Sequence, residues 1–411
     1  MARLVRRVAV LSMHTSPLAQ PGTGDGGGMN VYVRELCTAL ARAGSECDVF
    51  TRADDPEAPA VIPVEPGFRV HHVPAGPIAP VPKADLGGLV EEFADGVGTW
   101  LERSPVQLIH AHYWLSGAAG HLLKHRLDLP LVSTFHTLER VKAATGASDG
   151  GDDPRRVETE QAVIGCSDAI LAPNVPESDH LVNLYDAPRD RIRVVAPGVD
   201  HAFFAPGDRT RARRALGLPT EGRMLLFIGR IQPLKGADVA VGTLEHLRRE
   251  DAFLVVAGGA SGPGGQAEVV RVRALVDEAG LSDRVHFFPP QPHELVSTFC
   301  RAADVCLVPS RTESFGLVAL EAGACGVPVV ATSVGGLRSL IVDGQTGVLV
   351  PERRPEAFAR AVEWVLNSPE RGRALGQAAA VNARRYSWRR AAAAVDSLHS
   401  ELSERQLVEC A

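Results

Sequence analysis

Two pairs of charged side chains follow short apolar runs in the second half of the chain. In MLLFIGRIQPLKG, Arg230 and Lys235 come directly after the run MLLFI. In VCLVPSRTESFGLVALE, Glu313 follows the run VCLVP, and Glu321 comes eight residues later. An arginine guanidinium can bind a phosphate through two N–H groups, and a lysine ammonium adds a second positive charge, so this pair suits a diphosphate. Carboxylates can accept hydrogen bonds from the hydroxyls of a bound ligand. Each pair alone could be solvated loop charges or a helix cap, but the combination favours a binding site.

A helix is expected to begin near Phe315, between the two glutamates. The first backbone N–H groups of a helix have no acceptor inside it, and its dipole favours negative charge there. We therefore expect a phosphate to be bound by the N–H groups of Gly316, Leu317 and Val318.

A glycine-rich stretch near the N-terminus, HTSPLAQPGTGDGGGMNVYV, leaves three interpretations open. Gly22, Gly24 and Gly27 satisfy the GxGxxG pattern of dinucleotide-binding proteins. That pattern requires a glycine at the end of the first strand, whereas the run RVAVLS ends near Ser12. The alternatives are a surface loop that needs positive φ, or a loop that brings backbone N–H groups to a phosphate at a helix N-terminus. The last interpretation, which we favour, involves Gly26, Gly27 and Gly28 before a helix starting at Met29 or Asn30.

Short apolar runs alternate with longer amphipathic ones along the chain, which predicts parallel sheets with helices on both faces. The expected strands are RVAVLS, CDVFT, RVHHV, VQLIHAHY, LPLVSTFH, AILAPN and IRVVAPG, then MLLFIGR, FLVVAGG, VHFFPP, VCLVPS, VPVVATS and GVLVP. A Pro-, Gly- and charge-rich stretch predicts domains at 1–204 and 205–386, and a last helix over about 387–411 that can pack back on either. Ligands bind at the carboxyl ends of such strands, so we expect the site in a cleft between the domains.

Composition excludes several classes of protein. The chain has 411 residues, 45% of them hydrophobic and 22% charged, which fits two globular domains rather than a disordered or membrane chain. A net charge of −6 without a basic cluster argues against nucleic-acid binding. The N-terminal apolar run is too short for a signal peptide. Seven scattered cysteines without a CxxC pair predict a cytoplasmic protein with neither a disulfide framework nor a zinc ribbon.

The motifs ESFGLVALE and GRIQPLKG resemble the signatures of the retaining glycosyltransferases of family 4. The resemblance covers nearly the whole chain and implies the GT-B fold, two Rossmann-like parallel-sheet domains facing across a cleft. The stretches HTSPLAQPGTGDGGGMNVYV and AHYWLSG are similar to those of members that transfer N-acetylglucosamine from UDP to inositol 3-phosphate, the first step of mycothiol biosynthesis. Sucrose-phosphate synthases share related stretches, which keeps another phosphorylated or small polar acceptor open.

The resemblance also implies roles for individual residues. The catalytic group would be His136, Arg230, Lys235 and Glu313, with His136 near the sugar 6-hydroxyl. The donor would be bound by Gln20, Pro21, Gly28, Arg230, Lys235, Gln291, Glu313, Gly316, Leu317, Val318 and Glu321. The acceptor would be bound by His14, Asp25, Gly26, Gly27, Gly28, Met29, Asn30, Lys83, Tyr113, Thr137 and Arg156. Lys83, Tyr113, Thr137 and Arg156 would hold its phosphate, and two cations with two hydroxyls are a sound composition for that task.

The chemistry that the resemblance implies needs no cofactor beyond a UDP-sugar donor. We expect no catalytic metal, although some relatives carry a peripheral Mg²⁺ ion. The HxH pair His110 and His112 could bind a metal but is expected to pack in the core. Partners would be small-molecule substrates, with no nucleic acid or membrane, and relatives suggest a homodimer. Ala143 and Val327 depart from the pattern of the inositol-phosphate enzymes, where asparagine and threonine are expected.

The mechanism and the reaction class remain predictions at this point. No carboxylate is an evident nucleophile beneath the anomeric carbon, so we expect same-face substitution with a donor phosphate oxygen as base. Three rival classes stay open. A UDP-sugar epimerase would form product from the donor alone, and a non-catalytic module would bind the nucleotide-sugar without turnover. A membrane-surface glycosyltransferase would need a basic amphipathic patch, for which HLLKHRLDLP is only modestly basic.

Overall fold

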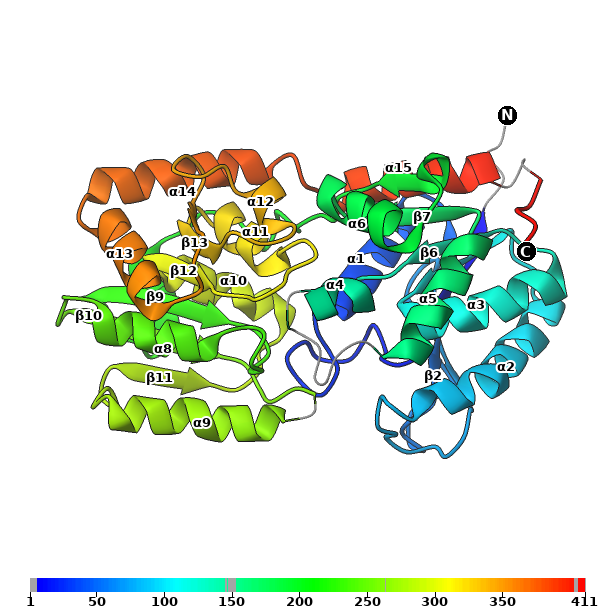
Figure 1. Ribbon diagram of the computed structural model, residues 1–411, viewed down its shortest axis with the longest axis horizontal. Coiled ribbons are helices and arrows are strands. Elements are labelled where there is room, and N and C mark those ends of the chain that lie inside the picture. Colours follow the sequence, from blue (N-terminus) through cyan, green and yellow to red (C-terminus); the bar gives the residue numbers. More distant parts are fainter. Residues whose placement is uncertain (1–5, 145, 147–152, 263, 403–405, 411) are drawn as a thin grey trace. The chain divides into compact units, whose positions relative to one another are not determined.

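The computed structural model describes residues 6–144, 146, 153–262, 264–402 and 406–410. Its contacts divide the chain into two compact units, each built on its own sheet (Figure 1). Unit 1 comprises Met1–Ala19, Met29–Ala196 and Trp388–Ala411, and unit 2 comprises Gln20–Gly28 and Pro197–Ser387. The main change from unit 1 to unit 2 thus lies at Ala196–Pro197, whereas the sequence prediction placed it after residue 204. The short segment 20–28 also groups with the second unit. The C-terminal helix groups with unit 1.

Unit 1 is built on an eight-stranded sheet of order β3-β4-β2-β1-β5-β6-β7-β8. All neighbouring strands pair in parallel except β3, which pairs antiparallel with β4 at the edge. The strands are β1 Arg7–Leu11, β2 Glu46–Arg52, β3 Val61–Glu65, β4 Phe68–Val73, β5 Leu108–His112, β6 Leu131–Thr134, β7 Ala169–Ala172 and β8 Ile192–Val194. The central strands β1, β5 and β6 are almost wholly buried, as expected where helices cover both faces.

Helices cover both faces of this sheet. They are α1 Gly28–Arg42, α2 Val90–Arg103, α3 Trp114–Leu127, α4 Glu139–Ala144, α5 Pro154–Cys166, α6 Val175–Tyr185 and α15 Trp388–Leu402, with 3₁₀ turns at Leu86–Leu89 and Arg189–Arg191. Helix α15 presents an apolar stripe at helical spacing, including Trp388, Ala391 and Val395. These side chains pack in one core with Val33 and Leu36 of α1, which explains why the end of the chain belongs to unit 1.

Unit 2 is built on a six-stranded, all-parallel sheet of order β11-β10-β9-β12-β13-β14. The strands are β9 Arg223–Ile228, β10 Ala252–Ala257, β11 Val285–Phe288, β12 Val305–Val308, β13 Val329–Thr332 and β14 Val348–Val350. The helices are α7 Arg209–Ala215, α8 Ala237–His246, α9 Gly265–Glu278, α10 His293–Ala302, α11 Leu317–Ala324, α12 Leu337–Leu340, α13 Pro355–Leu366 and α14 Pro369–Ala383. Helices α8, α9 and α13 share one apolar core with the sheet.

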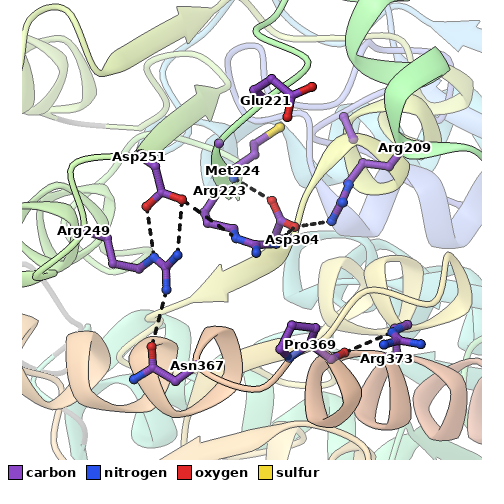
Figure 2. A network of polar contacts seen from close by, with 12 residues as sticks. Arg209, Glu221, Arg223, Met224, Arg249, Asp251, Asp304, Asn367, Pro369 and Arg373 are labelled. Atoms are coloured by element: carbon purple, nitrogen blue, oxygen red, sulfur yellow. Dashed lines mark hydrogen bonds and ion pairs between the residues drawn. The ribbon is translucent and has the colours of Figure 1, made fainter.

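A buried carboxylate ties the amino ends of strands β9 and β12 to helix α7. Asp304 accepts hydrogen bonds from the backbone N–H of Met224 at 2.8 Å and from the buried guanidinium of Arg213 at 2.6 Å. Arg209 pairs with the same carboxylate, and Arg223 lies 3.6 Å from it (Figure 2). Burial lowers the pKa of Arg213, and Asp304 opposes that shift. This network lies at the end of the sheet opposite the carboxyl ends of the strands.

The cysteines differ from the sequence prediction in one respect. Cys166, the last residue of α5, is paired in a disulfide with Cys410 near the C-terminus, and their Cα atoms are 4.9 Å apart. The sequence analysis predicted no disulfide framework and did not anticipate this one pair, because the 244 residues between the partners hide the pairing from any local spacing. The other five cysteines are free and buried. Over the described stretches, no helix combines the length and apolarity that crossing a membrane requires.

Candidate functional site

Each sheet has a switch point, where neighbouring strands are followed by connections to opposite sides. In unit 2 it lies between β9 and β12, and in unit 1 between β1 and β5. Ligands of open α/β sheets bind at the carboxyl ends of strands beside such a point. The predicted residues Arg230 and Lys235 follow β9, and Glu313 follows β12. The topology of unit 2 therefore places these three residues at the expected binding edge.

An ion pair joins the two sides of this switch point in unit 2. Lys235 Nζ lies 2.6 Å from Glu313 Oε2, and Ser310 Oγ donates to the same oxygen at 3.2 Å. Both charged side chains keep about a fifth of their surface exposed, at 23% and 18%. Arg230 Nη1 is 3.4 Å from Ser261 Oγ after β10. The edge thus carries two cations and one carboxylate that remain accessible to a ligand.

The glycine-rich segment 20–28 packs against the same edge of unit 2. The Gln20 side-chain amide donates to the carbonyl of Pro290 at 2.8 Å. A Cβ atom added to Gly27 would lie 3.2 Å from Nε of Arg230, so a larger residue here would require the guanidinium to move by a few tenths of an ångström. Gly28, the first residue of α1, lies beside Leu317, where an added Cβ would be 3.5 Å from Cδ1. This arrangement fits a loop that brings backbone close to a ligand.

The dinucleotide interpretation of the same glycines does not fit. Strand β1 ends at Leu11 and α1 begins at Gly28, so Gly22 and Gly24 lie in the middle of the connection rather than at the strand end. Both adopt positive φ, 89° and 50°, as turn residues do.

Helix α11 begins at Leu317, two residues after the predicted start near Phe315. Its N-cap is Gly316, with φ of 99°, and the N–H groups of Leu317 and Val318 in the first turn have no acceptor inside the helix. The carbonyl of Glu313 accepts from the N–H of Gly336 at 2.8 Å. A Cβ on Gly335 would lie 2.2 Å from that carbonyl oxygen. A close backbone contact therefore fixes the loop that carries Glu313.

Glu321 lies two turns into α11 and is 5% exposed. Its Oε1 lies 2.6 Å from Nε2 of His293, the first residue of α10. The predicted residue Gln291 lies two positions earlier, and its side-chain amide donates to the carbonyl of Pro289 at 2.7 Å. His293 was not predicted. Its position at the start of the helix that follows strand β11, near the carboxyl edge of the sheet, is the signal that could have identified it.

In unit 1 the structure brings together all four residues predicted to hold a phosphate. Arg156 Nη1 donates to the Tyr113 hydroxyl at 3.1 Å, and Nη2 donates to the carbonyl of Thr137 at 2.9 Å and to its Oγ1 at 3.2 Å. Lys83 Nζ lies 4.5 Å from the centre of the Tyr113 ring. Tyr113 follows β5 and has φ of 76°, which directs the chain into α3. We call Lys83, Tyr113, Thr137, Lys142 and Arg156 the unit 1 cation cluster.

Lys142 belongs to this cluster, although it was not predicted to bind a ligand. Its Nζ lies 3.6 Å from Glu139, which also pairs with Arg156 at 2.9 Å. Burial would raise the pKa of the Tyr113 hydroxyl, but Lys83, Arg156 and Lys142 together lower it below its usual value. Burial also lowers the pKa of Lys142, and the neighbouring Arg156 adds to that effect. The three cations around this phenol outnumber the carboxylates Glu139 and Glu160 that pair with them, and a positive environment suits a phosphate.

Arg156 is held in place by helix α5. Asp153 caps the helix by accepting from the backbone N–H groups of Arg155 and Arg156, and Pro154 occupies its first turn. Arg156 Nε donates to Glu160 at 2.7 Å, one turn further on. Glu160 is fully buried and also accepts from the Tyr185 hydroxyl.

His136 follows strand β6 with φ of 60°, a conformation uncommon outside glycine. Its Nε2 lies 3.0 Å from Nδ1 of His112, and the Tyr32 ring meets it edge-on at 5.0 Å. Burial lowers the pKa of His136 to about 3, and His110 adds to that effect. The imidazole is therefore neutral near pH 7. His110 and His112 stack at 4.3 Å and, with His399, form part of the core.

The remaining predicted acceptor residues lie on both units. In unit 1, His14 stacks on Tyr113 with ring centres 4.4 Å apart. The buried Asn30 side chain donates to Thr15 Oγ1 at 2.7 Å and to the carbonyl of Ser16 at 2.6 Å. Met29 packs against the apolar core. Asp25, Gly26, Gly27 and Gly28, together with the donor residues Gln20 and Pro21, lie in the segment that groups with unit 2.

Comparisons with known proteins identify the family of this chain. Residues 26–203 match the model described as "Glycosyltransferase Family 4", and residues 208–381 match "Glycosyl transferases group 1". A curated D-inositol 3-phosphate glycosyltransferase of Xylanimonas cellulosilytica is 48% identical, with 97% of this chain and 98% of that protein covered. The enzyme of the same name from Mycobacterium tuberculosis is 46% identical, covering 93% of this chain and 80% of its own.

Solved structures show the same architecture. A sucrose-phosphate synthase of Thermosynechococcus elongatus has a TM-score of 0.91 at 32% identity, covering 97% of this chain and 99% of its own. HepE of Anabaena, solved with UDP and glucose, has a TM-score of 0.77 at 17% identity, covering 97% of this chain and all of its own, and supports the fold alone. The predicted fold class is confirmed, and this chain belongs to the family 4, group 1 glycosyltransferases of GT-B fold.

Proposed function

We propose that this glycosyltransferase transfers N-acetylglucosamine from UDP-N-acetylglucosamine to 1D-myo-inositol 3-phosphate, with retention at the anomeric carbon, as the first step of mycothiol biosynthesis. The unit 1 cation cluster is the observation that carries the choice of acceptor. Three cations around Tyr113 suit a phosphorylated acceptor, whereas a neutral sugar alcohol would not compensate their charge. Four relatives that are 42–48% identical to this chain are named D-inositol 3-phosphate glycosyltransferases, which supports the same acceptor.

The binding edge of unit 2 suits the donor. In the proposal, Arg230 and Lys235 neutralise the diphosphate, together with the N–H groups of Gly28 and of the first turn of α11. Glu313 binds hydroxyls of the transferred sugar. The buried carboxylate of Glu321, oriented by His293 at 2.6 Å, binds the ribose hydroxyls. Backbone near Gln291 recognises the uracil, with Gln20 and Pro21 on the facing loop.

The proposed reaction is a same-face substitution. A double displacement needs a carboxylate beneath the anomeric carbon, but Glu313 is engaged with Lys235 and Ser310. The bond from the anomeric carbon to the β-phosphate oxygen breaks, the acceptor oxygen forms the new bond, and its proton passes to a phosphate oxygen. Arg230 and Lys235 stabilise the charge that develops on UDP. His136 stays neutral and hydrogen-bonds the sugar near its 6-hydroxyl.

The acceptor is proposed to bind through unit 1. Its phosphate contacts Lys83, Tyr113, Thr137 and Arg156, and its ring hydroxyls contact His14 and Asn30. No cofactor takes part in this chemistry. We further propose that the enzyme works in the cytoplasm, as a homodimer, on small molecules alone.

The test is nucleotide release by the purified protein from UDP-N-acetylglucosamine, with and without inositol 3-phosphate, combined with mass spectrometry. The proposal predicts UDP release that depends on inositol phosphate and a product of the summed mass. Conversion of the donor without any acceptor would indicate an epimerase or hydrolase instead. Binding of the donor without turnover would indicate a nucleotide-sugar-binding protein that is not an enzyme.

A second candidate acceptor is fructose 6-phosphate, with UDP-glucose as donor. The match to a sucrose-phosphate synthase at a TM-score of 0.91 and 32% identity favours it, as does Ala143 at the expected asparagine position. The same assay distinguishes the two reactions. Turnover only with UDP-glucose and fructose 6-phosphate would agree with the proposed donor site but contradict inositol 3-phosphate as the acceptor.

A further inference from the structure

A group of metal-ligand side chains lies in unit 1, away from the residues assigned to either substrate. His121 and His125 occupy one face of α3, one turn apart in the stretch HLLKH. Cys166 ends helix α5 beside them, and Cys166 Sγ lies 3.3 Å from His125 Nε2. One potential ligand atom from each of the three lies within 4.8 Å of the others. Among the residues that the structure describes, this is the one such group of histidine, cysteine and acidic residues.

The C-terminal segment brings a fourth ligand. Cys410 is bonded to Cys166, with Cα atoms 4.9 Å apart. The segment is held by the backbone N–H of Val408, which donates to Asp168 at 2.7 Å. Two cysteines and two histidines therefore meet at one point, although they come from α3, α5 and the end of the chain.

A buried ion pair fixes the elements that carry these ligands. Lys124, between the two histidines on α3, donates to the carbonyl of Cys166 at 2.8 Å and to Asp168 at 2.7 Å. Asp168 also accepts from the backbone N–H of Leu131 at 2.8 Å. Lys124 and Asp168 are 3% and 8% exposed. The frame around the ligands is therefore built and rigid, as a preformed metal site requires.

We propose that His121, His125, Cys166 and Cys410 form a tetrahedral zinc site when the Cys166–Cys410 disulfide is reduced. Two thiolates and two imidazoles are a standard structural zinc set, and two histidines four apart on a helix share the face needed. In a zinc tetrahedron, a sulfur and a nitrogen ligand lie about 3.5 Å apart, given bonds of about 2.3 and 2.0 Å. The 3.3 Å between Cys166 Sγ and His125 Nε2 agrees with that spacing.

The site has two alternative states, linked by a defined reaction. A dithiol reductant breaks the S–S bond, becomes a disulfide itself, and leaves Cys166 and Cys410 as thiols. Zn²⁺ then replaces the two thiol protons, which pass to water. Either state attaches the C-terminal segment to α3 and α5. A disulfide alone would not require two histidines beside the sulfurs. This inference does not depend on the proposed substrates.

The test is zinc content of the full-length protein, reduced with a phosphine, incubated with zinc chloride and dialysed without oxygen. Reduced wild type should hold about one zinc per chain, the disulfide form should hold none at this site, and zinc should raise the melting temperature of the reduced protein only. His121→Ala and Cys410→Ser should each lose the bound zinc. His246→Ala, which removes an exposed histidine of unit 2, should keep it.

Cobalt binding provides a second measurement that does not depend on the measured zinc content. The reduced protein with Co²⁺ should show the absorption of a tetrahedral, thiolate-ligated ion, and His121→Ala should abolish it. His121 is only half-buried, so its replacement leaves the fold intact. Equal zinc in reduced wild type and His121→Ala, or no zinc in reduced wild type, would overturn the proposal.

Discussion

Replacing Lys83 with methionine should weaken binding of a phosphorylated acceptor with little effect on the fold. Lys83 is half-buried and lies 4.5 Å from the centre of the Tyr113 ring. At about 4 Å, a pair of unit charges interacts by about 1 kcal/mol in water and about 4 kcal/mol near a protein surface. A hydrogen bond to a charged group contributes roughly 1.5–3 kcal/mol. The KM for the phosphorylated acceptor should therefore rise about 10- to 150-fold.

The assay compares inositol 3-phosphate with unphosphorylated inositol at saturating donor. The variant should lose its preference for the phosphorylated acceptor, while the KM for the UDP-sugar stays unchanged because unit 2 is untouched. Arg103→Met, which removes an exposed cation from α2, is the matched control and should behave as wild type. An unchanged ratio of kcat/KM between the two acceptors would refute a phosphate site at Lys83.

The Tyr113 hydroxyl gives an independent readout of the same site. Burial raises its pKa, but the cations lower it further than burial raises it, so loss of Lys83 should raise the pKa. Burial raises the pKa values of Tyr32 and Tyr185 far above the usual range, so Tyr113 should ionise before them in a titration followed by ultraviolet absorbance. Since a phenolate repels a phosphate, acceptor affinity should fall as the pH rises through the pKa of Tyr113. An affinity that rises with pH would contradict this sign.

Three further predictions concern catalysis and stability. Arg230→Ala or Lys235→Ala should lower kcat on the order of 10²-fold, as loss of other electrostatic stabilisers does, with Arg360→Ala as control; near-normal turnover in both would refute the role. Asp304→Ala leaves Arg213 buried without its carboxylate, so urea unfolding should show a loss of about 3–5 kcal/mol; an unchanged midpoint would contradict that. Buried neutral histidines take up protons only on unfolding, so acidification below about pH 6.5 should lower the free energy of unfolding by roughly 1 kcal/mol per pH unit for each. Equal stability at pH 7.5 and 5.5 would exclude this effect, which we assign to His110, His112 and His399.

Sequence patterns predicted the features of the fold that are determined by residues close together in the chain. Parallel strands buried on both faces are continuous apolar runs, so the central strands could be recognised from runs such as MLLFI and VCLVP. Because ligands bind beyond the carboxyl ends of such strands, Arg230, Lys235 and Glu313 could be assigned to one edge of the sheet from the sequence. In the structure, Lys235 and Glu313 form an ion pair of 2.6 Å at that edge. The acceptor residues came from the resemblance instead, since a lone lysine or tyrosine carries no spacing signal.

Contacts between distant parts of the chain were not predictable in this way. Edge strand β3 contains Pro63 and has no buried face, so it lacks the apolar run that marks the other strands. The Cys166–Cys410 pair is separated by 244 residues, and no period relates the two positions. Lys142 and His293 reach their sites through the packing of α4 and α10, which sequence spacing does not record.

The charged side chains at the two sites bear on the proposal that both ligands are anions. In unit 1, Lys83, Lys142 and Arg156 face the buried carboxylates Glu139 and Glu160, which leaves one positive charge in excess. In unit 2, Lys235 pairs with Glu313, and Arg230 adds a second cation at the same edge of the sheet. When no ligand is bound, the glutamates stabilise each site because they offset part of the repulsion between its cations. In the proposed function, a phosphate or diphosphate supplies the opposing charge, which a neutral acceptor would lack.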